Sequence, residues 1–181
     1  MDPSSPSNTK TPSRPFPPRD YARVLNKLPA PGTTSQEQLM QAVCDGLWDC
    51  FSAEGLSWIG FYTFSRSAPT EMLLSSRRDK PACSPIGLHG VCGQSWSARR
   101  PIIVRDVRSL GDNYVACDPR DMAEVVVPLL NPDGTCWAVL DGDSHSVNAF
   151  DAFDALALWR LVRHVGLSAH EHEDPALVIV K

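Results

Sequence analysis

The sequence lacks any apolar run of the length that a membrane helix needs. A helix that crosses a bilayer takes about 20 consecutive apolar residues, and charged residues, 21% of the 181, interrupt every candidate. The first residues have no apolar stretch after their charges, which argues against a secretory signal. We therefore expect a cytoplasmic protein without a membrane partner.

The sequence also has little clustered positive charge. It contains 17 Lys and Arg against 21 Asp and Glu, for a net charge of -4. Basic residues gather only in short pairs such as Arg77-Arg78 and Arg99-Arg100. Nucleic-acid binding needs a positive surface that neutralises phosphates. We therefore expect no nucleic-acid partner and favour a small neutral or zwitterionic ligand.

Paired metal-binding cysteines are missing as well: there are six cysteines, and none is spaced as Cys-x-x-Cys. A reducing compartment disfavours fixed structural disulfides, so these cysteines are core residues, metal ligands or redox-active thiols. The segment His170-Glu171-His172 lies in a tail that the pattern does not place, so we expect no metal and no bound cofactor. Three cysteines lie in predicted helices or strands and are expected to fill the core: Cys44, Cys50 and Cys136.

The composition divides the chain into three parts. Residues 1–18 are rich in Pro and Ser and nearly free of aliphatic residues, so they cannot bury enough apolar surface to order themselves, and we expect a disordered tail. Residues 19–168 carry the periodic patterns of one domain, and residues 169–181 are expected to form a C-terminal tail.

The periodicity of residues 19–168 predicts helices at both ends around a set of hairpin-connected strands. Thr34 and Glu37 have the spacing of a capping box before the second helix, and residues 131–134 (Asn-Pro-Asp-Gly) predict a turn between two strands. This order predicts an α+β domain with a central antiparallel sheet flanked by helices. The predicted helices are 19–28, 34–51, 90–98 and 150–167, and the predicted strands are 56–64, 72–75, 102–105, 124–130 and 135–141, with a turn near 68–70.

Thiols, carboxylates and aromatic residues gather at the predicted loops and strand ends. Asp141 and Asp143 should share one side of a strand, because strand side chains repeat every two residues. Trp58 and Tyr62 likewise share one face. Loop-borne polar groups beside a sheet often line a pocket. The candidate set is Cys83, Cys92, Cys117, Glu124, Asp141, Asp143, Trp58 and Tyr62.

Six short motifs resemble those of the free methionine-(R)-sulfoxide reductases, a family of single GAF domains. They occur in the order of that family, and the resemblance covers residues 34–167. The motifs are SWIGFY (57–62), KPAC (80–83), GVCG (90–93), ACD (116–118), EVVVPL (124–129) and VLDGDS (139–144).

The resemblance implies an oxidoreductase for oxidative-stress repair that reduces free L-methionine-(R)-sulfoxide. Cys117 matches the catalytic thiol, which attacks the sulfur and becomes a sulfenic acid. Cys83 matches the resolving cysteine that closes a disulfide, and Cys92 matches an auxiliary one. The family also implies recycling by thioredoxin and a homodimer.

The resemblance gives the remaining residues substrate-binding roles: Trp58 and Tyr62 pack on the methyl end, and Glu124, Asp141 and Asp143 contact polar groups. Crowded carboxyls raise one another's pKa, so one of them can donate the proton that the sulfoxide oxygen needs. Their negative charge also favours a free ammonium group. The same charge opposes thiolate formation at Cys117, so we expect a compensating donor such as a backbone N–H group or a helix N-terminus.

A non-catalytic GAF sensor that binds a small ligand is the alternative, because one fold hosts many functions. A pure sensor has no need of three cysteines at the positions of the family, and sensors usually carry an output domain. The sequence therefore favours the enzyme.

Overall fold

The domain is built on one mixed sheet of seven strands, ordered β3-β2-β1-β6-β5-β4-β7. The computed structural model describes residues 13–30, 32–114, 117–169 and 174–180. The strands are β1 (Trp58–Ser65), β2 (Ala68–Arg78), β3 (Ile86–Gly87), β4 (Ile102–Val104), β5 (Ala123–Leu130), β6 (Cys136–Ser144) and β7 (Val178–Val180).

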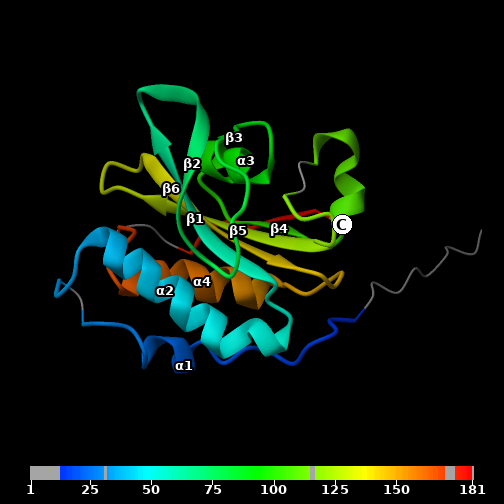
Figure 1. The fold of residues 1–181 in the computed structure, drawn as a ribbon, viewed down its shortest axis with the longest axis horizontal. Helices are drawn as coiled ribbons and strands as arrows, with labels where there is room; N and C mark the ends of the chain where they lie inside the picture. Colours follow the sequence, from blue (N-terminus) through cyan, green and yellow to red (C-terminus); the bar gives the residue numbers. More distant parts are fainter. Residues whose placement is uncertain (1–12, 31, 115–116, 170–173, 181) are drawn as a thin grey trace, which may run out of the picture.

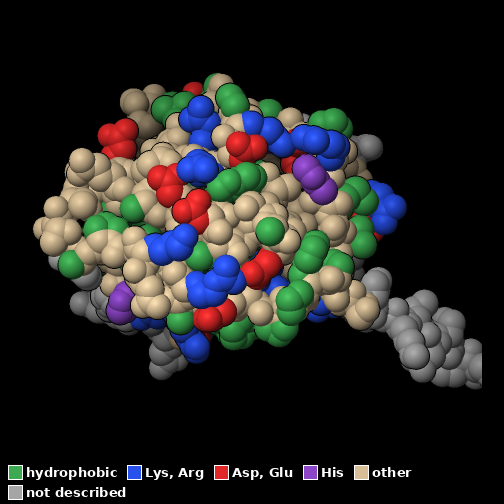
Figure 2. All heavy atoms as spheres, turned by 60° about the horizontal axis from the view of Figure 1, so that its bottom comes forward, with side chains coloured by type: hydrophobic (Ala, Val, Ile, Leu, Met, Phe, Trp, Pro, Cys, Tyr) green, Lys and Arg blue, Asp and Glu red, His purple; other side chains and the backbone are tan. Residues whose placement is uncertain are grey.

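Helices cover both faces of the sheet. Figure 1 shows α2 and α4 along one face, while α3 and the loop that carries β3 lie over the other. On the outer side of the α2 layer, Lys and Arg side chains are interspersed with Asp and Glu (Figure 2). The helices are α1 (Ala22–Leu25), α2 (Gln36–Phe51), α3 (Val91–Ala98) and α4 (Ala152–His164), with 3-10 turns at Ser52–Glu54 and Val107–Asn113. None of these helices in the described ranges is long and apolar enough to cross a membrane.

The alternation of strand side chains gives the sheet two apolar clusters. On β1, Ile59 and Phe61 belong to the cluster under α2 and α4, whereas Trp58 and Tyr62 belong to the cluster under α3. The cysteines expected in the core, Cys44, Cys50 and Cys136, are buried in the first cluster, which confirms that prediction. The second cluster surrounds the candidate site.

The predicted α+β class and its central antiparallel sheet are confirmed, with one addition at the edge. The strands β2, β1, β6, β5 and β4 pair antiparallel. The segment 178–180, expected to belong to a tail, instead forms β7 and pairs parallel with β4, Ile103 opposite Ile179. An edge strand of three residues is too short for its pattern to reveal it.

Several predicted boundaries were wrong by a few residues. The capping box uses Ser35 and Gln38 rather than Thr34 and Glu37, because the overlapping pairs both fit the pattern. Helix α4 begins after Asp151, whose carboxylate accepts hydrogen bonds from Phe153 N and Asp154 N. Strand β2 begins at residue 68, where a turn was predicted, and β6 continues to residue 144. The first helix spans only 22–25, where 19–28 was predicted.

Part of the predicted N-terminal tail packs on the domain. The Arg14 guanidinium donates to Asp151 at 3.0 Å and to Asp154 at 3.3 Å. Arg19 and the Tyr21 hydroxyl also reach Asp154, which is fully buried. Since a buried carboxylate needs cationic or donor partners, Asp154 holds this segment in place. The composition of residues 1–18 could not reveal that a buried carboxylate elsewhere in the chain would bind them.

Candidate active site

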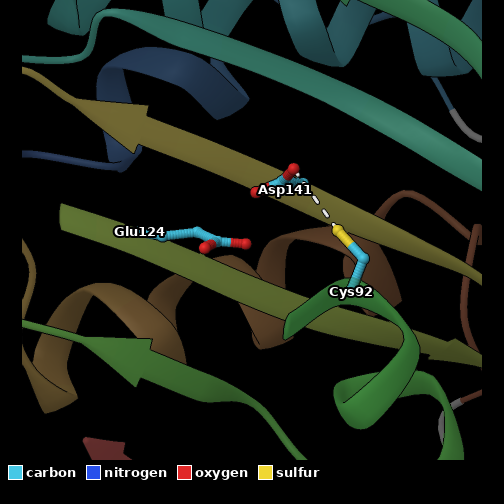
Figure 3. Close-up of side chains that lie close together, drawn as sticks. All are labelled: Cys92, Glu124 and Asp141. Atoms are coloured by element: carbon cyan, nitrogen blue, oxygen red, sulfur yellow. Dashed lines mark hydrogen bonds between the residues drawn. The ribbon is translucent and has the colours of Figure 1, made fainter. Parts of the chain in front are cut away.

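The sheet register brings the predicted acidic residues to one face. Asp143 on β6 lies between Trp58 on β1 and Glu124 on β5. Two residues along, Asp141 occupies the next position of β6 on the same face, because strand side chains alternate. Figure 3 shows the Glu124 carboxylate pointing from β5 toward the space beside Asp141. The two-residue spacings read from the sequence therefore place these groups together.

Helix α3 adds a thiol to this acidic face. Cys92 is buried in the first turn of α3, and its thiol donates to Asp141 Oδ2 at 3.4 Å (Figure 3). Ligand atoms of Cys92, Glu124 and Asp141 all lie within 4.8 Å of one another. Burial, followed by the charges of Asp141 and Glu124, raises the pKa of the Cys92 thiol. Cys92 is therefore a protonated hydrogen-bond donor rather than a ready nucleophile.

A small cavity opens beside these groups and reaches a second thiol. Its volume is about 60 Å³, well below that of pockets for drug-sized ligands. Asp141 Oδ1 is buried and, among the described residues, has no hydrogen-bond partner. The side chains that line the cavity are mainly Tyr62, Ile86, Val91, Cys92, Cys117, Glu124 and Asp141. A buried acceptor without a donor is costly, so the cavity suits a ligand that supplies an N–H group.

Burial keeps the acidic residues of this face from ionising easily. It raises the pKa of Glu124, and the charge of Asp143 raises it further. Burial likewise raises the pKa of Asp141, with Glu124 adding to the effect, and the pKa of Asp143, with Asp141 adding to it. A carboxyl with a raised pKa keeps its proton to higher pH than an ordinary one, which suits it to donate that proton.

Cys83 and Cys117 form an exposed thiol pair at the mouth of the site. Each side chain is exposed, and the Cys83 thiol lies close enough to Cys117 to shift the pKa of the Cys117 thiol. Loss of hydration, followed by the Cys83 thiol, raises the pKa of Cys117 to about 12. The Cys83 backbone acts in the opposite sense and lowers it. This influence offsets only part of the increase, and the compensating donor expected from the sequence stays a prediction.

The two aromatic residues hold the loop that carries Cys83. Trp58 Nε1 donates to the Lys80 carbonyl at 2.9 Å, and the Tyr62 hydroxyl donates to the Cys83 carbonyl at 3.0 Å. Both rings are nearly inaccessible to solvent. Five of the predicted site residues line the cavity, and three do not: Trp58, Cys83 and Asp143.

Sequence reasoning missed three neighbours of the site. Tyr114 is half-buried, and burial followed by Asp143 and Glu124 raises the pKa of its hydroxyl. Asp118 lies next to Cys117 in the chain and binds Lys80. Lys80 and Asp118 belong to the motifs KPAC and ACD, in which only the cysteine was assigned a role from the sequence. Tyr114 belongs to none of the motifs.

Two groups of side chains within the described ranges have the composition of metal ligands. One is Cys92 with Glu124 and Asp141; the other is Asp118 with Asp121 and His145. In the second group, Lys80 and Arg120 already pair with the Asp118 carboxylate and oppose a further cation. The segment His170-Glu171-His172 lies outside the described residues. We assign neither group to a metal, because the first also suits a ligand that supplies an N–H group to Asp141.

Gly93 allows α3 to approach the loop in front of it. A Cβ atom at this position would lie 2.2 Å from the Leu88 carbonyl oxygen. We expect Gly93→Ala to lower the free energy of unfolding by about 1–3 kcal/mol, the usual cost of overpacking, and to displace Cys92. Urea unfolding measures the loss. Gly90→Ala is the control, because a Cβ there meets nothing within 4 Å; equal losses in both variants would contradict the prediction.

Comparisons of the sequence with known proteins identify the family of this chain. The GAF domain family matches residues 33–168. The free methionine-R-sulfoxide reductase of Saccharomyces cerevisiae is 31% identical over 125 residues, which cover 67% of this chain and 69% of the yeast protein.

Solved structures of the same family have the same fold. The free methionine-R-sulfoxide reductase of Neisseria meningitidis, in complex with its substrate, is 32% identical with a TM-score of 0.67, covering 74% of this chain and 77% of that one. The reduced form of the Staphylococcus aureus enzyme is 26% identical with a TM-score of 0.71, covering 83% and 95%. This chain belongs to the free methionine-R-sulfoxide reductase family of GAF domains and is a reductase.

Proposed function

We propose that this protein reduces free L-methionine-(R)-sulfoxide by thiol chemistry at Cys117. The observation that carries the proposal is the unpartnered Asp141 Oδ1, buried in the cavity that Cys117 and Glu124 also line. The ammonium group of a free amino acid supplies both the missing donor and the opposite charge. A methionine inside a peptide chain has no such charge.

The first step reduces the sulfoxide and oxidises Cys117. The Cys117 sulfur attacks the sulfoxide sulfur while a nearby carboxyl protonates the oxygen, so an S–S bond forms and the S–O bond of the substrate breaks with loss of water. Water then attacks the Cys117 sulfur and returns a proton to the carboxylate, so the S–S bond breaks and methionine leaves. The products are methionine and a sulfenic acid on Cys117. Glu124 suits the donor role, because burial raises the pKa of its side chain, and Asp141 is kept for the ammonium group. The thiol gives up its proton as the carboxyl delivers one, so the proton count balances.

The second step closes a disulfide. The Cys83 thiol attacks the sulfenic sulfur of Cys117, and water leaves. The Cys83 thiol raises the pKa of Cys117, which reflects the proximity of the two groups and supports this pairing. Two electrons from an external dithiol, for which we propose thioredoxin, then restore both thiols. The exposure of Cys83 and Cys117 supports access by such a protein.

The proposal is tested with the four forms of the substrate. Purified protein is assayed with the R and S epimers, each free and within a peptide, using dithiothreitol and then thioredoxin as reductant. We expect turnover of the free R form alone. Binding of that form without turnover would indicate a sensor, and turnover of the peptide form would show that the acidic face does not select the ammonium group.

The two candidate resolving cysteines should behave differently. We expect Cys83→Ser to release methionine in one turnover and then stall with thioredoxin, because the sulfenic acid lacks a partner. Cys92→Ser should recycle, since Cys92 is buried on Asp141 and a serine hydroxyl keeps a donor there. Rapid-quench methionine assays and mass spectrometry of the oxidised cysteines measure both. Normal recycling by Cys83→Ser with stalling of Cys92→Ser would exchange the two roles.

A further inference from the structure

An ion pair joins the two loops that carry the exposed thiols. Lys80 Nζ donates to Asp118 Oδ2 at 2.5 Å, across 38 residues of sequence. Lys80 stands three positions before Cys83, and Asp118 directly follows Cys117. The Asp118 side chain is 10% exposed and that of Lys80 is 34% exposed. The pair therefore joins the two loops at positions close in sequence to Cys83 and Cys117, and neither of its residues lines the cavity.

Each end of this ion pair is fixed by further contacts. The Lys80 carbonyl accepts from Trp58 Nε1, which ties its backbone to β1. Asp118 Oδ1 accepts from both the backbone N–H and the Nε of Arg120, which orients the carboxylate. Asp118 O also accepts from Asp121 N. Because both partners are anchored, their ion pair can fix the distance between the two loops, which a contact between two mobile side chains cannot do.

A second place in the chain separates the role of Lys80 from that of Arg120. Asp106 and Arg108 repeat the contacts that Asp118 makes with Arg120: the backbone N–H, the Nε and a terminal nitrogen of the arginine all bind the aspartate. This arrangement is thus a local turn that the chain also forms away from the site. Lys80 is the additional partner of Asp118, and it comes from the other thiol loop.

The remaining charged groups near Asp118 do not replace Lys80. The His145 imidazole lies 3.7 Å from Asp118 and 3.6 Å from Asp121, and it is carried by the segment after β6. Arg120 belongs to the same loop as Asp118. Of the cationic groups paired with Asp118 in the described ranges, Lys80 alone comes from the loop of Cys83.

We propose that Lys80 is a positioning residue, whose ion pair with Asp118 holds Cys83 against Cys117 for disulfide closure. The proposal rests on the function proposed above for its physiological oxidant, but the closure itself does not depend on the sulfoxide. Hydrogen peroxide also converts the Cys117 thiol to a sulfenic acid and releases water. Cys83 then displaces a second water and forms the disulfide.

The test compares Lys80→Met with Lys80→Arg, and with Lys27→Met as a matched control. Lys27 also forms an ion pair, with Asp49, on an exposed surface away from the thiols. Each reduced variant is oxidised with hydrogen peroxide and, in a second arm, with free methionine-(R)-sulfoxide. Dimedone trapping reports the sulfenic acid, and non-reducing mass spectrometry reports the disulfide.

We expect Lys80→Met to close the disulfide about 10- to 100-fold more slowly, the usual effect of a displaced reacting group, so that trapped sulfenic acid accumulates. The first methionine should form at nearly the normal rate. Lys80→Arg should restore closure, and Lys27→Met should leave it unchanged. Normal closure in Lys80→Met, or equal slowing of both steps together with a lower Tm, would overturn the proposal. If wild-type protein fails only in the sulfoxide arm, the proposed substrate is wrong and the peroxide arm still decides the role of Lys80.

Discussion

Reduced Cys117→Ser protein mixed with an equal amount of free methionine-(R)-sulfoxide should release no methionine. Cys117 is the one thiol that both lines the cavity and is exposed to solvent, and a serine hydroxyl is a far weaker nucleophile toward sulfur. Loss of a nucleophile typically costs about 10⁴- to 10⁶-fold in rate. Rapid quenching and amino-acid analysis measure the methionine formed in this single turnover.

The matched control for that experiment is Cys136→Ser. Cys136 is buried in the other cluster of the sheet, and its thiol donates to the Ala138 carbonyl at 3.2 Å, a contact that a hydroxyl can keep. This variant should release methionine at the normal rate. Methionine release by Cys117→Ser would contradict the assignment and would direct the search to Cys83, the other exposed thiol.

The part of the site that lies on regular strands could be predicted from the sequence. A spacing of two or four residues decides which face a strand side chain occupies, so Trp58 with Tyr62, and Asp141 with Asp143, were placed correctly relative to each other. The pairing of Glu124 with Asp143 needed the register, which depends on the turn between β5 and β6. That turn was itself marked by Asn131-Pro132-Asp133-Gly134.

The contacts between irregular loops could not be predicted. Cys83 and Cys117 are separated by α3 and β4, and no periodicity relates positions on two loops. Only the family resemblance paired them. The ion pair of Lys80 with Asp118, and the hydrogen bonds from Trp58 and Tyr62 to loop carbonyls, likewise depend on the path of the backbone. Trp58 and Tyr62, which the resemblance predicts to pack on the substrate, hold the thiol loop by these hydrogen bonds, and their contact with substrate stays a prediction.

Removing one carboxyl group from the acidic face should weaken catalysis while it strengthens the fold. We expect Glu124→Gln and Asp141→Asn each to lower kcat/KM for the free R sulfoxide by about 30- to 1,000-fold, the cost of removing one partner of a buried charge pair. Steady-state assays measure this loss. Glu71→Gln, the same change on β2 outside the cavity, is the control and should leave kcat/KM unchanged.

The stability of these variants should change in the opposite direction, and with pH. Burial raises the pKa of Glu124 in the folded protein, so between the ordinary glutamate pKa and this raised value the folded state binds more protons than the unfolded state. The free energy of unfolding therefore falls as pH rises through that range. Glutamine at position 124 does not titrate, so the variant avoids this loss of stability. We expect the Tm of Glu124→Gln to exceed that of the wild type at pH 8, and the difference between the two Tm values to be smaller at pH 4. A Tm of Glu124→Gln that falls along with kcat/KM would show that Glu124 stabilises the fold. A carboxyl that serves the substrate should instead destabilise the folded protein while the site is empty.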